Sequence, residues 1–345
     1  MAFLLNRQRR VREIVVAKAT VCKWVDITHN SGSASGRIQT IKNNGDTWMM
    51  GQYDGYASRS IDKGYTWSAL PRGLNSGGTT HVYGIVPGNN RVWVSVHLSG
   101  YAARSTDDGA TWAPLTRGLN SGSATDDIHT VASDTRGTWV SGHNKGYAAR
   151  SVDNGATWSA LPKGLNCGDP ASAITVVLAD GKGVWLAVNA SGYASRSTDN
   201  GLNWSPLPRG LNSGNTTDGF RAMETDGKGL WIVVGSPGGY ASQSVDNGAT
   251  WNPTARNLNQ EEATVNFTHN GLATDKKGTW MHGSMHAASP YDAYRTISFS
   301  TDNGVTWKNG IAGDSNETVR ITALGCGNGR FIYGESTGIM RGTEL

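Results

Sequence analysis

The chain has 345 residues, of which 46 are glycine, 13 are tryptophan and 17% are charged. Its formal net charge is +4, and residues 1–23 alone carry six basic residues and Glu13, a net of +5, so the rest of the chain carries about −1. A nearly neutral body argues against a nucleic-acid-binding face. No segment approaches the length of a transmembrane helix, so we expect no membrane insertion.

The chain begins with a basic arm, MAFLLNRQRRVREIVVAKAT, whose apolar runs are short and interrupted by charge, which makes it a poor signal peptide. Its mixture of apolar residues and arginines suits docking into a partner. The candidate docking residues are Arg7, Arg9, Arg10 and Arg12. We therefore predict a docking arm at residues 1–20 and a single domain at residues 21–345.

The cysteines Cys22, Cys167 and Cys326 are too few to form a disulfide framework, which suggests folding in a reducing compartment. Cys167 stands where three other copies of a repeated phrase have serine.

The body alternates short apolar runs with glycine-rich turns, and it lacks any stretch of ten residues with helical periodicity. The phrase S-x-D-x-G-x-T-W occurs five times, and a sixth copy has Asn203 in place of Thr. The aspartates of the six copies are Asp62, Asp107, Asp153, Asp199, Asp246 and Asp302. They are 45, 46, 46, 47 and 56 residues apart, and a period near 46 is typical of a four-stranded propeller blade.

Each period is predicted to contain four strands; in the third they fall near residues 128–133, 139–142, 146–151 and 158–161. Tight turns containing glycine separate the strands, since glycine accepts the positive φ that such hairpins need.

The aromatic residues predict the number of blades. Six tryptophans belong to the repeated phrase and six begin the second strands, which leaves Trp24, and Phe331 stands at the second-strand position of the last segment. Two aromatics in each of seven blades make fourteen. We therefore predict an all-β fold: a seven-bladed β-propeller of four-stranded antiparallel blades. The last blade combines residues 21–30 with residues 317–345, so that no blade edge is left unpaired.

The repeated phrase resembles the Asp-box (BNR) repeat of the sialidase-like propellers, and six copies cover residues 30–310. The resemblance implies that each copy is a hairpin joint between the third and fourth strands, on the face away from a sialidase active site. The aspartate then has a structural role.

The loops of the opposite face carry three sets of candidate ligand or partner contacts. The first set is the basic residues that precede the GLNSG-like linkers, namely Arg72, Arg117, Lys163 and Arg209, with His29 in the closing blade. They are interpreted either as a ring that contacts acidic glycans or as residues that keep the rim soluble.

The second set lies at the ends of the second strands, where His97 and His143 stand in positions held elsewhere by Gln52, Asn189 and Ser236. They are interpreted either as hydrogen-bonding a ligand or, as the default, as a solvated or locally bonded polar rim. Because equivalent positions on different blades point apart, we expect no metal, and nothing in the chain indicates a cofactor.

The third set comes from a ten-residue excess in the sixth period, located at residues 282–296. Its candidate contacts with a partner or a ligand are Met285, His286, Tyr291 and Tyr294.

A sialidase would need three arginines, a Tyr–Glu nucleophile pair and an acidic Asp. The first strands carry Arg37, Arg221 and Arg320, but the F/Y-R-I-P motif of that family is absent and no carboxylate pair can be identified. No catalytic residues are therefore assigned, and the chain is predicted not to be an enzyme.

The preferred hypothesis is a structural or adhesion propeller, a component of a bacteriophage virion such as a tail hub, fibre or decoration protein. It would be made in the host cytoplasm, dock through its arm onto other virion proteins or copies of itself, and contact host surface polysaccharide. A secreted or surface lectin or sialidase-like glycoside hydrolase is the alternative. A further alternative is a scaffold resembling the Asp-box propeller that assists photosystem II assembly.

Overall fold

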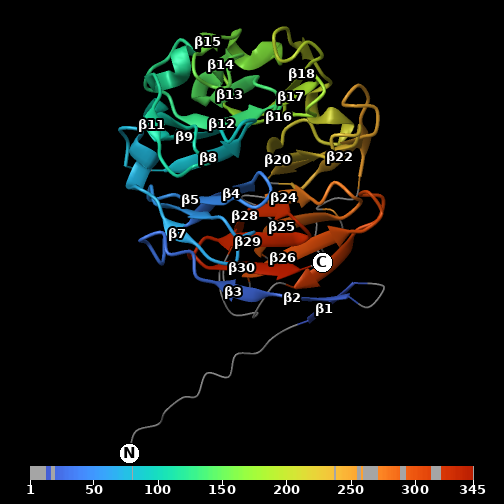
Figure 1. Cartoon of the computed structure of the whole chain (residues 1–345). Coiled ribbons are helices and arrows are strands. Elements are labelled where there is room, and N and C mark those ends of the chain that lie inside the picture. Colours follow the sequence, from blue (N-terminus) through green and yellow to red (C-terminus); the bar gives the residue numbers. More distant parts are fainter. Residues whose placement is uncertain are drawn as a thin grey trace, which may run out of the picture.

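The computed structural model describes residues 13–16, 20–79, 81–236, 238–254, 258, 271–287, 293–311 and 320–344. These residues form seven four-stranded antiparallel sheets and one separate two-stranded sheet. The sheets follow one another around a ring (Figure 1), and the first strand of each sheet packs beside the first strand of the next. The predicted seven-bladed β-propeller is confirmed.

Blades 1 to 6 repeat one order, in which each strand pairs with its successor. Blade 1 contains β4 (Ile38–Asn43), β5 (Trp48–Gln52), β6 (Ala57–Ser60) and β7 (Ser68–Ala69). Blade 2 contains β8 (Val82–Pro87), β9 (Trp93–His97), β10 (Ala102–Ser105) and β11 (Ala113–Pro114). Blade 3 contains β12 (Ile128–Ser133), β13 (Trp139–His143), β14 (Ala148–Ser151) and β15 (Ser159–Ala160).

Blade 4 contains β16 (Ile174–Ala179), β17 (Trp185–Asn189), β18 (Ala194–Ser197) and β19 (Ser205–Pro206). Blade 5 contains β20 (Gly219–Thr225), β21 (Trp231–Ser236), β22 (Ala241–Ser244) and β23 (Asn252–Pro253). Blade 6 contains β24 (Gly271–Thr274), β25 (Trp280–Ala287), β26 (Ala293–Ser300) and β27 (Lys308–Ile311). The helical segments among the described residues are short 3₁₀ turns: η1 (Arg72–Asn75), η2 (Leu98–Gly100), η3 (Arg117–Asn120), η4 (Asn144–Gly146), η5 (Lys163–Asn166) and η6 (Arg209–Asn212).

Blade 7 joins the two ends of the chain. Its strands are β28 (Ile321–Gly327), β29 (Arg330–Glu335), β30 (Met340–Glu344) and, from the other end, β3 (Val25–Ile27). Val25 pairs with Gly342 and Ile27 with Met340, while the ring of Trp24 meets that of Tyr333 at 4.6 Å. A separate hairpin, β1 (Glu13–Val16) and β2 (Thr20–Lys23), precedes β3 and lies outside the ring (Figure 1).

The repeated phrase forms the turn between the third and fourth strands. In blade 1, Ser60 Oγ donates to Asp62 Oδ1 at 2.7 Å, and Gly64 N donates back to Ser60 Oγ at 2.9 Å. The carboxylate of Asp62 also accepts from Thr66 N at 2.8 Å and from Thr66 Oγ1 at 2.6 Å. The indole of Trp67 then donates to Gly64 O at 3.0 Å, which ties the turn to the buried ring. The phrase therefore acts as a joint within each blade.

The GLNSG-like linkers join one blade to the next. Asn75 Nδ2 donates to the carbonyl of Trp112 in blade 2 at 3.4 Å, and the same bond recurs from Asn120, Asn166 and Asn212 at 3.2 Å. Leu74 has a φ of 49°, a left-handed conformation that is unfavourable for leucine, and its side chain is fully buried. Burial of the leucine offsets the backbone strain at each linker.

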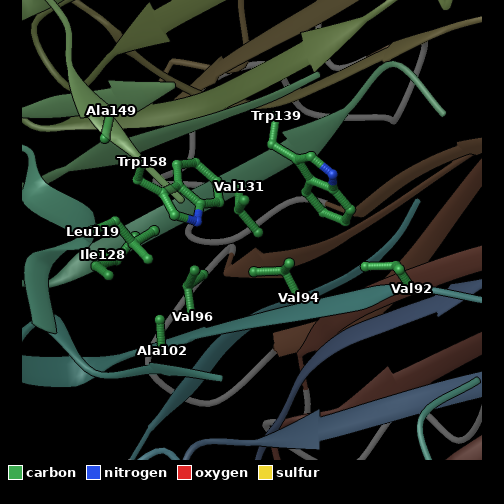
Figure 2. Packing of buried hydrophobic residues seen from close by; sticks show 10 residues of the cluster. All are labelled: Val92, Val94, Val96, Ala102, Leu119, Ile128, Val131, Trp139, Ala149 and Trp158. Carbon is green, nitrogen blue, oxygen red and sulfur yellow. The ribbon is translucent and has the colours of Figure 1, made fainter. Parts of the chain in front are cut away.

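The core lies between blades. Figure 2 shows Val94 and Val96 of blade 2 facing Ile128, Val131 and Trp158 of blade 3. Six tryptophans that begin second strands are fully buried: Trp48, Trp93, Trp139, Trp185, Trp231 and Trp280. Each blade thus needs its neighbours to bury its apolar faces.

Replacing Asp153 by Ala removes the acceptor of Ser151 Oγ, Thr157 N and Thr157 Oγ1. We expect the free energy of unfolding to fall by about 1–3 kcal/mol, measured by chemical denaturation. The control is Val152→Thr, because Val152 is exposed and threonine stands at the matching position in Thr106, Thr198 and Thr301. If both variants unfold alike, the aspartate does not hold the turn.

Candidate functional site

The basic residues of the linkers are exposed and stack on a tyrosine of their own blade. The Arg72 guanidinium lies 4.8 Å from the centre of the Tyr56 ring and donates to the Asp54 carbonyl at 2.9 Å. The other pairs are Arg117 on Tyr101, Lys163 on Tyr147 and Arg209 on Tyr193, at 4.4, 4.6 and 4.4 Å. These cations hold the connection between the second and third strands, and a role in contacting a ligand stays a prediction.

Of the two expectations for the histidines at the second-strand ends, the structure shows local bonding rather than solvation. His97 and His143 are fully buried, and Ser95 Oγ and Ser141 Oγ lie 3.0 and 2.8 Å from their Nε2 atoms. Ser121 of the preceding linker lies 3.4 Å from His143 Nδ1. The residue at this position bonds to the incoming linker, as Gln52 does with Ser31 in blade 1. Because they are buried, His97 and His143 cannot be surface contacts.

His29 also differs from the prediction. It is buried, and its Nε2 lies 2.8 Å from the carbonyl of Gly338. It therefore does not continue the exposed series of basic residues.

The excess residues of the sixth period lengthen a hairpin. β25 and β26 each have eight residues, and the added part pairs Met285 with Arg295 and His286 with Tyr294. Tyr291 and the arm residues Arg7, Arg9, Arg10 and Arg12 lie outside the described residues. Contacts of Met285, His286, Tyr291 and Tyr294 with a partner stay predictions.

A group of polar residues gathers near the ring axis, on the face opposite the repeated turns. We call it the axial cluster; each member is in ring contact or electrostatic interaction with another, and the members are Arg37, Tyr53, His81, Tyr83, Asp127, His129, Arg221 and Arg320. Tyr83, His129 and Arg221 occupy one position in the first strands of blades 2, 3 and 5, at a bulge where the register with the second strand shifts, and Thr175 holds that position in blade 4. Arg37, His81, Asp127 and Arg320 immediately precede first strands.

Rings form a continuous shelf within the axial cluster. The rings of Tyr53 and His81 lie 3.5 Å apart, and those of Tyr83 and His129 lie 5.1 Å apart. His81 meets Tyr83 edge-on at 5.9 Å, and the Arg37 guanidinium lies 5.9 Å from the Tyr53 ring. Main-chain bonds fix the shelf, since Tyr53 N donates to Arg37 O and His81 N donates to Tyr53 O.

The electrostatics of the cluster favour an anion. Burial, and next the charge of Arg320, lowers the pKa of Arg37. Arg37 Nε is buried and has no hydrogen-bond partner among the described residues. Three guanidinium groups and one carboxylate, that of Asp127, leave a charge of 3 − 1 = +2 when the imidazoles are neutral.

Burial favours the neutral forms of Tyr83, His81 and His129 in the same cluster. Burial, reinforced by Asp127, raises the pKa of Tyr83 to about 12, and burial lowers the pKa of both His81 and His129. The carboxylate of Asp127 is fixed by Ser99 N at 2.7 Å.

The opposite end of the axis is crossed by an ion pair. Lys42 Nζ of blade 1 lies 3.8 Å from Glu224 Oε2 of blade 5, and these two blades are not neighbours in the ring.

The three arginines of the cluster are apparent from the sequence, whereas their neighbours in the cluster are not. A signal was available: residues next to the first strands differ from blade to blade, while the turns and linkers repeat. Among the described residues, no group of three or more His, Cys, Asp or Glu side chains could hold a metal ion. No helix in the same residues is long and apolar enough to cross a membrane.

No protein-family profile and no curated protein sequence matches the chain. Solved structures match its fold. YCF48 bound to D1 peptide has a TM-score of 0.66 at 16% identity, covering 97% of this chain and 99% of the other. The GH74 xyloglucanase from Xanthomonas campestris has a TM-score of 0.68 at 15% identity, covering 93% of this chain and 53% of the other. YCF48 from Cyanidioschyzon merolae has a TM-score of 0.64 at 15% identity, covering 93% and 98%.

At such identities the likeness shows the fold alone, and the chain spans about half the length of the xyloglucanase it matches. Hydrolase and binding proteins share this fold, so function has to be argued from the residues of the site.

Burial, and next the charge of His129, lowers the pKa of His143 from 6.5 to about 3. Above pH 6.5 the imidazole of His143 is neutral in both the folded and the unfolded chain. As the pH falls below 6.5, the unfolded chain takes up the proton first, so the free energy of unfolding decreases down to about pH 3. We predict that His143→Asn, which copies Asn189 of blade 4, reduces the slope of the free energy of unfolding against pH by about 1.4 kcal/mol per pH unit.

The measurement is denaturant unfolding between pH 4 and 7, about the range over which the two states bind protons differently. Asn189→Gln, which changes the matching position without adding or removing a titratable group, should leave the slope unchanged. An unaltered slope in His143→Asn would show that His143 is not neutral in the folded protein.

Proposed function

We propose that the chain is a non-enzymatic propeller that works by binding, and that its axial cluster recognises an acidic group on the ligand. The observation that carries the proposal is the position of Arg37, which lies over the Tyr53 ring, with burial and next the charge of Arg320 lowering its pKa. Arg37 Nε is buried there, and none of the residues that the structure describes forms a hydrogen bond with it. A buried guanidinium nitrogen without a hydrogen-bond partner is unfavourable, and an anion bound to Arg37 would supply that partner.

The ring shelf supports a ligand that has a flat or pyranose face as well as an acidic group. Tyrosine and histidine rings offer apolar faces for stacking, and arginine recognises carboxylates through two parallel hydrogen bonds. An acidic surface polysaccharide meets both requirements, and it is the ligand that we propose.

The hydrolase alternative has less support, because hydrolysis of a glycosidic bond ordinarily uses two carboxylates and the axial cluster contains one, Asp127. The scaffold alternative is supported by fold alone, through the neighbours that match this chain over nearly their whole length.

In its fuller form, the proposal makes the chain a component of a bacteriophage virion, attached through the arm at residues 1–20. Support comes from the arginine-rich composition of that arm and from the β1–β2 hairpin, which lies outside the ring (Figure 1). A virion component should copurify with particles at fixed stoichiometry, and removing residues 1–12 should prevent incorporation. Normal incorporation of the shortened chain would contradict docking through the arm.

The axial site is tested with oligogalacturonate, an oligosaccharide of uronic acids, and a neutral xyloglucan oligosaccharide as its control. Calorimetric titration of the full-length protein should show binding of the acidic probe, weakening as salt increases. Arg37→Ala and Arg320→Ala should each weaken it at least about tenfold, or about 1.4 kcal/mol. Arg136→Ala, at an exposed turn on the opposite face, should leave binding unchanged.

Equal affinity in all three variants would rule out the axial cluster as the binding site. Release of reducing sugar that disappears in Asp127→Asn would contradict the non-enzymatic assignment.

A further inference from the structure

The closing blade contains an open pocket of about 610 Å³ beside the end of β3. One wall is formed by Asp26, Ile27 and residues 28–34 of the linker, and the other by Gly338, Ile339 and Met340. The matching place in blades 1 to 4 is filled by the stacked cation and tyrosine described above.

The linker of the closing blade is two residues shorter than the others. Asn30 Nδ2 donates to the Trp67 carbonyl at 3.0 Å, as Asn75 does to the carbonyl of Trp112, so Asn30 corresponds to Asn75. Asn30 follows Trp24 by six positions, whereas Asn75 follows Trp67 by eight. The missing residues correspond to Arg72 and Gly73.

A side chain replaces part of what is missing. In blade 1, Gly73 N donates to the Gly55 carbonyl at 2.8 Å; in the closing blade, His29 Nε2 lies 2.8 Å from the carbonyl of Gly338. The hydrogen bond to the carbonyl of the glycine is therefore kept, although a side chain now makes it. The guanidinium of Arg72 has no counterpart in the closing-blade linker.

The stacking ring is missing as well. Tyr56 accepts from Gln52 N at 2.8 Å through its carbonyl, and Ile339 accepts from Glu335 N at 2.9 Å in the same way. Ile339 thus occupies the position of the tyrosine. The pocket is the space that an arginine and a tyrosine fill in the other blades.

We infer that this pocket receives an arginine side chain from the N-terminal arm of the same chain, residues 7–12. In blades 1, 2 and 4 the guanidinium donates to the carbonyl of Asp54, Ser99 and Ser191, respectively. Thr337 occupies that position in the closing blade. Ile339 offers an apolar wall for the arginine stem, while Asp26 on the rim, 58% exposed, is already paired with Arg341 at 2.8 Å, so the carbonyl and the apolar wall are what would hold the arginine.

The arm is within reach of the pocket. Glu13, which directly follows residues 7–12, pairs with Lys23, which is three residues from Asp26, a span of at most about 11 Å in an extended chain. Tethering at this distance makes the local concentration of arginine high, and the body that receives it carries a net charge near −1. This site is separate from the axial cluster and does not depend on anion binding there.

The test rebuilds the missing pair in the full-length protein. One variant inserts Arg-Gly between Thr28 and His29 and adds Ile339→Tyr, so the pocket is filled from within as in blade 1. The other carries Ile339→Tyr alone, which supplies a stacking ring and leaves the place of the guanidinium open. The readout is the rate at which an arginine-specific protease cleaves the arm, with thermal unfolding as the check on folding.

We expect cleavage of the arm to be at least about tenfold faster in the filled variant than in the native chain, and slower than native in Ile339→Tyr alone. Equal rates in all three proteins would overturn the inference. Protection that rises with protein concentration would also overturn it, because the arginine would then come from a second copy. Since incorporation into particles is measured separately, failure of this inference can be told apart from failure of docking through the arm.

Discussion

The pairing of β3 with β30 is the constraint on which the rest of the structure depends. Three residues from one end of the chain complete the sheet formed by the other end, and Trp24 packs on Tyr333 behind them. Without β3 the last blade would expose an edge strand and part of an apolar face. Closure also sets the distance between blades 7 and 1, which carry Arg320 and Arg37, so the candidate site depends on the same contact.

Residues that repeat from blade to blade hold the fold together, whereas the candidate binding sites lie where the repeat is broken. The serine, aspartate and glycine of the turns and the asparagine of the linkers make the same bonds in successive blades, and these bonds hold blades together. The axial cluster and the closing-blade pocket lie where the repeat is broken. Since a propeller does not need different residues at equivalent positions for stability, the breaks are the natural places to look for binding.

Much of the fold could be predicted from the sequence, because its determinants are local and recur. The spacing of aspartates gave the blade size, and the position of Trp24 relative to Phe331 indicated how the ring closes. The burial of His97 and His143 could not be predicted, since their partners come from the end of a linker folded against them. Counting five positions from Trp24 aligns His29 with the basic residues of the other linkers. Because the closing-blade linker is two residues shorter, His29 instead takes the place of a leucine.

The axial cluster was only partly predictable for a related reason. Arg37, Arg221 and Arg320 are far apart in sequence, and closure of the ring brings them to one end of the axis beside rings that carry no motif. The Lys42–Glu224 contact across the axis likewise joins blades that are distant in sequence. The number of blades decides which first strands meet across the axis, so contacts of this kind cannot be predicted before that number is known.

The most direct test of the account is hydrogen exchange on a chain lacking residues 1–27, compared with one lacking residues 1–12. Closure by β3 predicts that the longer deletion lowers amide protection in β30 and also in β28 and β4, on either side of the junction between blades 7 and 1, while the shorter deletion leaves all three protected. Loss of protection confined to β30 would contradict the claim that this short strand holds the ring together.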